Sequence, residues 1–430
     1  MIRTRGAVAL AISLATASAA AAQALPEADP EALGFASDRL DRIETAFDAA
    51  IERGALPGAV IMVARQGQLA YARALGSIDP QNGEAMSEDA IFRIYSMTKP
   101  FTSVAALILM EDGALHLADP VAKFLPEFAE MEVVTEDGTE PANRAMTVQD
   151  LLRHTSGLAY AEITRNEAVR EGYAAAGAYA PDVLPFDSRA AAPEEQVAGV
   201  AGTPLLHQPG TVFEYSFSTD ILGRVVESAS GQRLGDFLEE RLFGPLGMVD
   251  TGFHVPENAM PRLALTFDVD PATGGAVPLM DVSAQPANDS GGAGAVSTAA
   301  DYLRFAQMLA NGGELDGTRI LSPTTVRLMA SDHLGDIDHG VGPGNLLLGT
   351  PGYGFGLGVM VRAQDGIAAV PGAPGQFMWA GYGGTYFWVD PEEGLVAVLM
   401  SARAPERPYF RRHLMQLVYQ AIVDEPGAHD

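Results

Sequence analysis

Cysteine is absent from this chain of 430 residues, so disulfide bonds and thiolate metal sites are excluded. Charged residues are also scarce, at 19% of the sequence, and the basic ones are the minority, which leaves a formal net charge of −28 at pH 7. Such an acidic chain lacks the basic surface that nucleic acids and anionic membranes require, so neither is expected as a partner. Hydrophobic residues make up 47% of the sequence, which is enough for a substantial core.

Motifs that mark several enzyme classes are missing as well. G-x-S-x-G does not occur, which excludes the nucleophile elbow of the α/β-hydrolases. H-E-x-x-H is absent and the eight histidines are scattered, so no metal site is expected. His154 is interpreted as a structural histidine that closes a helix. Neither a G-x-G-x-x-G segment after a strand nor a Walker loop is present, so no cofactor is expected.

The first 24 residues have the features of a cleavable signal peptide. Arg3 and Arg5 precede an apolar run from Ala7 to Ala22, and Ala22-Gln23-Ala24 offers small residues where signal peptidase reads them. We therefore expect a secreted or periplasmic mature protein, with an uncleaved anchor as the alternative. No later stretch of eighteen or more residues is uncharged and apolar, so no membrane association is expected after cleavage. The oligomeric state stays open.

The order of the predicted elements indicates an α/β fold. Apolar periodicity and glycine or proline breaks predict strands near both ends of the chain and short helices between them. The expected helices are 38–53, 96–110, 147–153, 219–230, 299–310 and 411–422, and the expected strands are 59–63, 69–72, 92–95, 355–361, 377–379, 385–389 and 395–400. We expect a largely antiparallel central sheet built by segments 25–117 and 288–430, flanked by helices, with a helical insert at about 118–287.

Ser96 and Lys99 form the candidate catalytic pair. A serine hydroxyl needs a nearby base to become a nucleophile, and a lysine three residues later on the first turn of a helix lies on the same face. The helix start also offers backbone N–H groups to a developing oxyanion. Only two of the 27 Lys and Arg residues are lysines, Lys99 and Lys123, and a lysine can lose its proton whereas arginine cannot. Lys123 is interpreted as an ordinary surface residue.

The arrangement around this pair resembles the penicillin-recognising superfamily. Ser96-x-x-Lys99 is similar to the first motif of β-lactamases and penicillin-binding proteins. Residues 147–158 (TVQDLLRHTSGL), 209–216 (PGTVFEYS) and 291–308 resemble segments of class C β-lactamases and their esterase relatives, in the same order. The resemblance therefore spans nearly the whole mature chain and implies the β-lactamase-like fold.

Two departures favour the esterase branch of that superfamily. The class C motif Y-x-N is replaced by Tyr215-Ser216-Phe217, so the amide is missing, and no lysine is followed by Thr-Gly as the third motif requires. In its place, residues 379–381 (WAG) resemble the W-G-G of family VIII carboxylesterases, with alanine at the middle position.

The resemblance implies a role for each site residue. Ser96 forms the acyl-enzyme, and Lys99 and Tyr215 handle protons, with the choice of first base left open. The backbone N–H groups of Ser96 and Tyr382 form the oxyanion hole. Trp379, Gly381 and Phe217 are expected to contact the substrate.

We thus expect a secreted serine hydrolase for small or short-acyl esters, with a small-molecule ester as its substrate. The alternatives are a β-lactamase, D-amino-acid peptidase or acyltransferase of the same fold, or a non-catalytic assembly protein. Because no cation stands beside Trp379 in the sequence, neutral esters are expected to be preferred over β-lactams.

Overall fold

The computed structural model describes residues 24–177, 184, 187–271, 274–403 and 405–424, so the predicted signal peptide lies outside it except for Ala24. Eight strands form one sheet in which every neighbouring pair is antiparallel, as predicted. In spatial order they are β10 (Tyr353–Phe355), β11 (Met360–Arg362), β12 (Phe377–Ala380), β13 (Tyr386–Asp390), β14 (Leu395–Ser401), β1 (Gly58–Arg65), β2 (Gln68–Asp79) and β3 (Glu84–Ala85).

The two ends of the chain meet in the middle of this sheet. Strand β1 pairs with β14 from Ala59 opposite Ser401 to Arg65 opposite Leu395, and every residue of both strands is buried. Runs of apolar residues without polar alternation suit strands that are covered on both faces. The expectation that N- and C-terminal segments build the sheet is thus confirmed, and the fold matches the predicted class.

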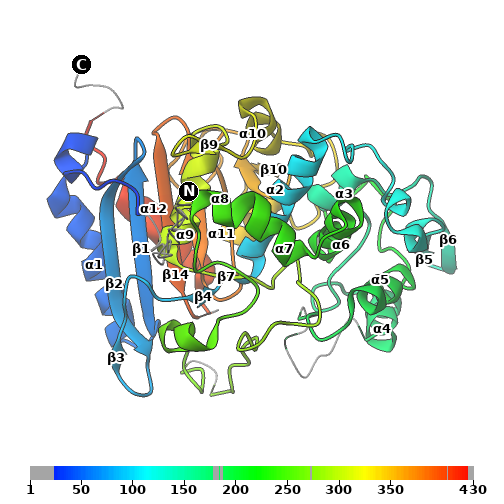
Figure 1. Cartoon of the computed structure of the whole chain (residues 1–430), viewed down its shortest axis with the longest axis horizontal. Helices are drawn as coiled ribbons and strands as arrows, with labels where there is room; N and C mark the ends of the chain where they lie inside the picture. The colour runs from blue at the N-terminus through cyan, green and yellow to red at the C-terminus, as the bar shows by residue number, and fades with distance from the viewer. Residues whose placement is uncertain (1–23, 178–183, 185–186, 272–273, 404, 425–430) are drawn as a thin grey trace, which may run out of the picture.

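Helices cover both faces of the sheet (Figure 1). On one face, α1 packs against β2 and α12, whereas on the other face α9 packs against β1, β13 and β14. The α-helices are α1 (Ser37–Glu52), α2 (Thr98–Glu111), α3 (Val148–Leu152), α4 (Glu167–Ala175), α5 (Pro193–Ala201), α6 (Ser218–Ser230), α7 (Leu234–Leu238), α8 (Gly244–Leu246), α9 (Ala299–Ala310), α10 (Pro323–Met329), α11 (Pro343–Leu348) and α12 (Arg407–Tyr419). No helix among the described residues is long and apolar enough to cross a membrane.

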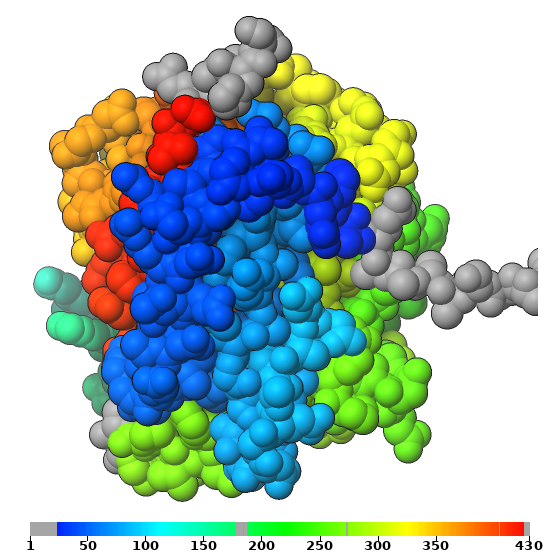
Figure 2. Space-filling view, turned by 90° about the vertical axis from the view of Figure 1, so that its left-hand side faces the viewer, coloured from blue at the N-terminus to red at the C-terminus, as the bar shows by residue number. Residues whose placement is uncertain are grey.

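The N-terminal and C-terminal helices lie side by side on the outer face (Figure 2). Arg39 Nη1 of α1 donates to the carbonyl of Gln420, at a distance of 2.8 Å, and Phe35 forms a β-bridge with Ile422. These contacts fix α12 relative to the sheet, which matters because the first turns of α12 border the candidate site.

Short strands and helical turns complete the fold. Three small antiparallel pairs are formed by β4 (Phe92–Arg93) with β7 (Val296–Ser297), β5 (Glu132–Thr135) with β6 (Gly138–Pro141), and β8 (Glu314–Leu315) with β9 (Thr318–Arg319). Short 3₁₀-helices are η1 (Pro30–Leu33), η2 (Tyr95–Met97), η3 (Val121–Lys123), η4 (Pro126–Phe128) and η6 (Glu257–Arg262), and η5 (Glu239–Phe243) is a π-helical turn.

Some elements differ from the prediction. Residues 355–361 are not one strand, because the chain turns between β10 and β11 at Gly358, whose φ is +88°. The insert at about 118–287 contains helices α3 to α8, and it also contains the β5–β6 hairpin, which was not predicted. Helix α12 begins at Arg407 rather than near residue 411, because a proline is tolerated in the first turn of a helix.

Candidate active site

A sharp turn delivers Ser96 from strand β4 into helix α2. Tyr95, the residue before the serine, has a φ of +46°, which is unusual for a residue with a bulky side chain. A non-glycine residue held in this region stores about 1–3 kcal/mol of strain, and such residues cluster at functional sites. The turn is fixed by Thr98 Oγ1, which donates to the Tyr95 carbonyl at 2.6 Å, and by the Tyr95 ring, which packs edge-on against Tyr382 with the ring centres 5.7 Å apart.

Lys99 is fully buried and its Nζ atom has three polar neighbours. Nζ lies 3.5 Å from Ser96 Oγ, 3.2 Å from the Tyr160 hydroxyl and 2.8 Å from the Gly292 carbonyl. These contacts hold Nζ beside the Ser96 hydroxyl. The predicted pairing of Ser96 with Lys99 is therefore present in the structure, at the long end of the hydrogen-bond range.

Tyr215 lies beside Lys99 but contacts it with its ring. Lys99 Nζ is 4.6 Å from the centre of the Tyr215 ring, and within the described part of the chain the buried Tyr215 hydroxyl has no hydrogen-bond partner. The ring is packed among His154, Tyr160 and Trp379, with centre-to-centre distances of 4.9, 5.4 and 5.5 Å. Tyr215 thus lies next to Lys99, as its expected role requires, but its hydroxyl forms no hydrogen bond with Lys99 in the structure.

Tyr160 and Asp220 are two site residues that the sequence analysis missed. Tyr160 donates to Asp220 Oδ2 at 3.5 Å, and burial raises the pKa of Tyr160 well above its usual value, so its hydroxyl stays protonated. Asp220 Oδ1 accepts from Ser290 Oγ at 2.6 Å and from the Gly292 N–H at 3.2 Å. Burial raises the pKa of Asp220, and the charge of Lys99 opposes that rise. Asp220 therefore fixes Tyr160 and Gly292, the two residues whose oxygen atoms accept hydrogen bonds from Lys99.

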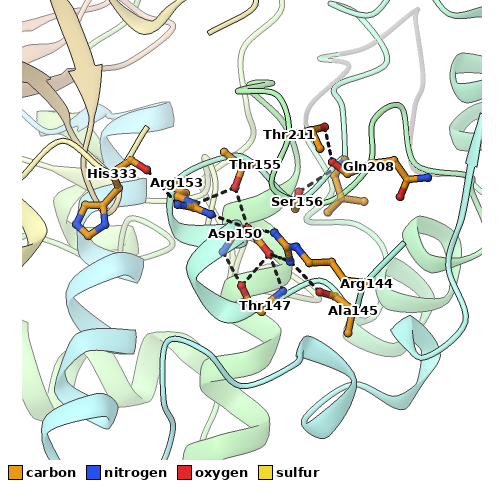
Figure 3. Close-up of polar contacts among 11 residues, drawn as sticks. Arg144, Ala145, Thr147, Asp150, Arg153, Thr155, Ser156, Gln208, Thr211 and His333 are labelled. Carbon is orange, nitrogen blue, oxygen red and sulfur yellow. Dashed lines mark hydrogen bonds and ion pairs between the residues drawn. The ribbon is translucent and has the colours of Figure 1, made fainter. Parts of the chain in front are cut away.

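The segment that carries Tyr160 is anchored by a buried carboxylate (Figure 3). Asp150 accepts hydrogen bonds from Arg144 and Arg153, from the hydroxyl of Thr155, and from both the N–H and the hydroxyl of Thr147, the cap of helix α3. Burial works to raise the pKa of Asp150, but the bonds from Arg144 and Thr147 outweigh it and lower this pKa to about 2. The network fixes the chain at the end of α3, a few residues before Tyr160.

His154 is structural, as its sequence context suggested. The residue is fully buried, and burial lowers the pKa of His154 well below its usual value, so the imidazole is neutral. Nδ1 lies 3.3 Å from Ser216 Oγ, and the ring packs against Phe213, Tyr215 and Phe355. Its φ of +55° places it at the turn that ends α3. The side chain does not line the cavity described next.

Ser96 opens onto a cavity of about 350 Å³. The side chains around it are mostly aromatic or aliphatic, with few polar groups. The lining residues are Ser96, Tyr160, Glu162, Ile163, Tyr215, Leu346, Leu347, Trp379, Ala380, Gly381, Tyr382, Arg407 and Arg411. A space of this size and character suits a small, largely apolar ligand. Across the described ranges, no group of three or more His, Asp or Glu side chains could hold a metal ion.

The residues predicted to contact substrate differ in their positions. Trp379, Gly381 and Tyr382 line the cavity with Ser96. Phe217 does not, because its ring is buried behind the Tyr160 ring, with the centres 4.6 Å apart. The expectation that Phe217 contacts substrate is therefore wrong. Phe217 is the N-cap residue of helix α6, which begins directly after the turn at Tyr215, and its side chain is buried in the core.

Two arginines enter the cavity wall from helix α12. No cation is next to Trp379 in the sequence, but Arg407 and Arg411 both line the cavity with it. They are 28 and 32 residues away in the chain, and only the packing of α12 brings them there. Arg407 donates to the Tyr382 carbonyl at 3.0 Å and stacks over the Tyr382 ring at 4.6 Å. The absence of a cation, on which the expected preference for neutral esters over β-lactams rested, is therefore not found in the structure.

Comparisons with known proteins identify relatives of this chain. Residues 40–421 match the model of the family described as β-lactamase. The chain is 36% identical to protein Rv1367c of Mycobacterium tuberculosis, covering 85% of this chain and 91% of that one. It is 33% identical to esterase EstB of Burkholderia gladioli, covering 88% and 94%. Its structure resembles that of EstCE1, a hydrolase with promiscuous acyltransferase activity, with a TM-score of 0.74 and 27% identity over 91% and 99% of the two chains.

Proposed function

The chain belongs to the β-lactamase family of serine hydrolases, and on this basis we propose that it cleaves small or short-acyl carboxylic esters. The observation that carries the proposal is the Ser96–Lys99 pair at the wall of a small aromatic cavity. Similarity to an esterase over most of both chains supports the same substrate class.

The proposed reaction passes through an acyl-enzyme. Lys99 acts here as the neutral amine. Ser96 Oγ attacks the ester carbonyl, and its proton moves to Lys99 Nζ, directly or through the Tyr215 hydroxyl. The tetrahedral oxyanion is held by the N–H groups of Ser96 and Tyr382. As the carbon–oxygen bond breaks, Tyr215 returns the proton to the leaving alkoxide, which departs as the alcohol. Water, deprotonated by the same groups, then attacks the acyl-enzyme and releases the carboxylic acid and free Ser96.

The Tyr215 step requires a small movement. The hydroxyl lacks a described hydrogen-bond partner in the free enzyme, and its ring already lies 4.6 Å from Lys99 Nζ. A bound substrate brings a leaving-group oxygen into the cavity that Tyr215 lines, which gives the hydroxyl a partner. Catalytic hydrogen bonds are often long in free enzymes and shorten when substrate binds.

Hydrolysis of β-lactams is the second candidate. Arg407 favours it, because a guanidinium in the wall could pair with the carboxylate that β-lactams carry. Against it stand Trp379 at the place of the third-motif lysine and Phe217 at the place of the asparagine. Acyl transfer, in which an alcohol instead of water attacks the acyl-enzyme, is a variant of the same chemistry.

Side-by-side kinetics decide between these candidates. We expect 4-nitrophenyl butyrate to exceed nitrocefin in kcat/KM by at least about tenfold. Ser96→Ala, assayed in parallel, separates catalysis by the site from contamination and from spontaneous hydrolysis. Comparable efficiencies on the two substrates would overturn the esterase proposal in favour of a β-lactamase. Adding a small alcohol and measuring the new ester reports acyl transfer in the same assay.

We also propose that the protein is exported and that residues 1–24 are removed. The charge, apolar run and small residues of that segment support this proposal. Mass determination of the protein from its native host should give a chain that begins at Leu25. A mature protein that retains residue 1 would contradict cleavage.

A further inference from the structure

Arg411 is bonded to the peptide that bears one of the two proposed oxyanion donors. Its Nη2 donates to the Gly381 carbonyl at 2.7 Å, and the N–H of Gly384 donates to the same oxygen at 3.2 Å. That carbonyl and the Tyr382 N–H belong to one peptide group. Through Nη1, Arg411 also donates to the Leu347 carbonyl at 3.1 Å, which ties α12 to α11.

The Gly381–Tyr382 peptide lies against the turn that carries Ser96. A Cβ atom on Gly381 would be only 2.2 Å from the Ile94 carbonyl oxygen and 2.2 Å from Thr385 Oγ1, so only glycine allows this approach. Thr385 Oγ1 in turn donates to the Ile94 carbonyl at 3.3 Å. The position of the peptide relative to Ser96 is therefore set by close backbone packing, and Arg411 adds a hydrogen bond to its carbonyl oxygen.

Arg411 is a buried cation without a carboxylate partner. Its side chain is 4% exposed, and no aspartate or glutamate in the described part of the chain forms an ion pair with it. Burial and the nearby charge of Arg407 lower the pKa of Arg411 to about 9, so the guanidinium is charged at neutral pH. Carbonyl dipoles compensate a buried charge only in part. Glu162 is the one acidic residue in the described lining of the cavity, and burial raises the pKa of its carboxyl; a new negative charge arises there when the oxyanion forms.

We propose that Arg411 is a positioning residue that strengthens the oxyanion hole through the Gly381 carbonyl; the proposal rests on the proposed acyl-enzyme mechanism. A donor on the oxygen of a peptide polarises the whole amide and makes its N–H a stronger donor. The guanidinium also adds positive potential in a site of low dielectric, where it acts on the transition state and hardly on a neutral ester. Arg411 thus favours the charged tetrahedral species through the peptide whose carbonyl it holds.

The test compares a charged tetrahedral analogue with a neutral ligand. Phenylboronic acid forms a negatively charged tetrahedral adduct on an active-site serine, whereas 4-nitrophenyl butyl ether is a neutral, unreactive analogue of the ester. Arg411→Gln should weaken the boronic acid about 10- to 100-fold and lower kcat similarly, because it removes support from one oxyanion donor. The inhibition constant of the ether and the KM of the ester should change less than about twofold.

Arg412→Gln is the matched control. Arg412 is the next residue on α12 and donates to the Leu348 carbonyl, as Arg411 does to Leu347, but it makes no contact with Gly381 among the bonds of the described residues. Its boronic acid affinity and kcat should stay close to wild type. If both variants lose boronic acid affinity equally, the effect comes from α12 packing and the proposal is overturned. Equal affinity of Arg411→Gln and wild type for the boronic acid overturns it too.

A second variant covers the case in which Arg411→Gln does not fold. Arg411→Lys keeps the buried charge but reaches only one of the two carbonyls. It should bind the boronic acid less tightly than wild type and retain its affinity for the ether; unchanged boronic acid affinity contradicts the proposal. Wild type that binds the boronic acid but does not hydrolyse 4-nitrophenyl butyrate contradicts the proposed substrate class alone. Wild type that binds no boronic acid contradicts the oxyanion hole, and with it the role of Arg411.

Discussion

Replacing Asp150 with asparagine should destabilise the protein strongly, and the loss should depend on pH. The pKa of this carboxyl falls from 3.8 to about 2 on folding, which corresponds to roughly 2 kcal/mol of unfolding free energy at neutral pH. A lowered folded-state pKa stabilises the folded protein above pH 4, and the contribution is lost as the pH falls toward 2. Because Arg144 and Arg153 also lose their partner, we expect a total loss of about 2–4 kcal/mol at pH 7.

Urea denaturation of wild type and Asp150→Asn at pH 7 and pH 3 measures this effect. The part of the difference due to the charge should shrink to about half at pH 3. Asp119→Asn is the control, because Asp119 pairs with the half-exposed Lys123 and such surface pairs contribute about 0–1 kcal/mol. A loss below about 0.5 kcal/mol for Asp150→Asn, or one that stays constant between the two pH values, would refute the argument from the buried network.

Three further predictions concern the catalytic groups. Lys99→Arg should lower kcat on 4-nitrophenyl butyrate about 10²- to 10⁴-fold, nearly as much as Lys99→Ala, because arginine cannot accept a proton; substantial activity in the arginine variant would mean that Lys99 acts through charge alone. Tyr215→Phe should lower kcat more than it raises KM, and an unchanged kcat with a raised KM would assign Tyr215 to binding. Gly381→Ala should nearly abolish turnover and destabilise the fold by about 1–3 kcal/mol, because its Cβ would clash with the Ile94 carbonyl; wild-type kinetics in this variant would exclude tight packing of that peptide.

Local pattern was enough to predict much of the fold. Helix α9 spans Ala299–Ala310 as predicted, because its amphipathic spacing and the Thr298 cap are both local signals. Strands β1 and β14 were found by their continuous apolar runs. Element boundaries were predicted wrongly where tertiary packing decides them. Gly358 lies so close to Ser103 that a side chain would not fit, and the chain turns there between β10 and β11. Helix α12 likewise begins before its predicted start.

Only the part of the site that lies within a sequence motif could be predicted. Ser96 and Lys99 are three residues apart, so helix geometry alone brings them together. Tyr160, Asp220 and Arg411 reach the same place from segments 61, 121 and 312 residues beyond Lys99, and no pattern in the sequence relates them to it. Phe217 was placed in the site because it stands where the class C motif Y-x-N has its asparagine, but at the start of α6 its side chain is buried in the core.

The central claim is that Ser96 is the nucleophile, and covalent labelling tests it most directly. A fluorophosphonate should add one phosphonyl group to the protein, and mass spectrometry of its peptides should locate that group on Ser96. Ser96→Ala should fold as wild type does, because the loss of one hydroxyl contributes little to stability, and it should take up no label. Labelling at another residue, or equal labelling of Ser96→Ala, would contradict the account.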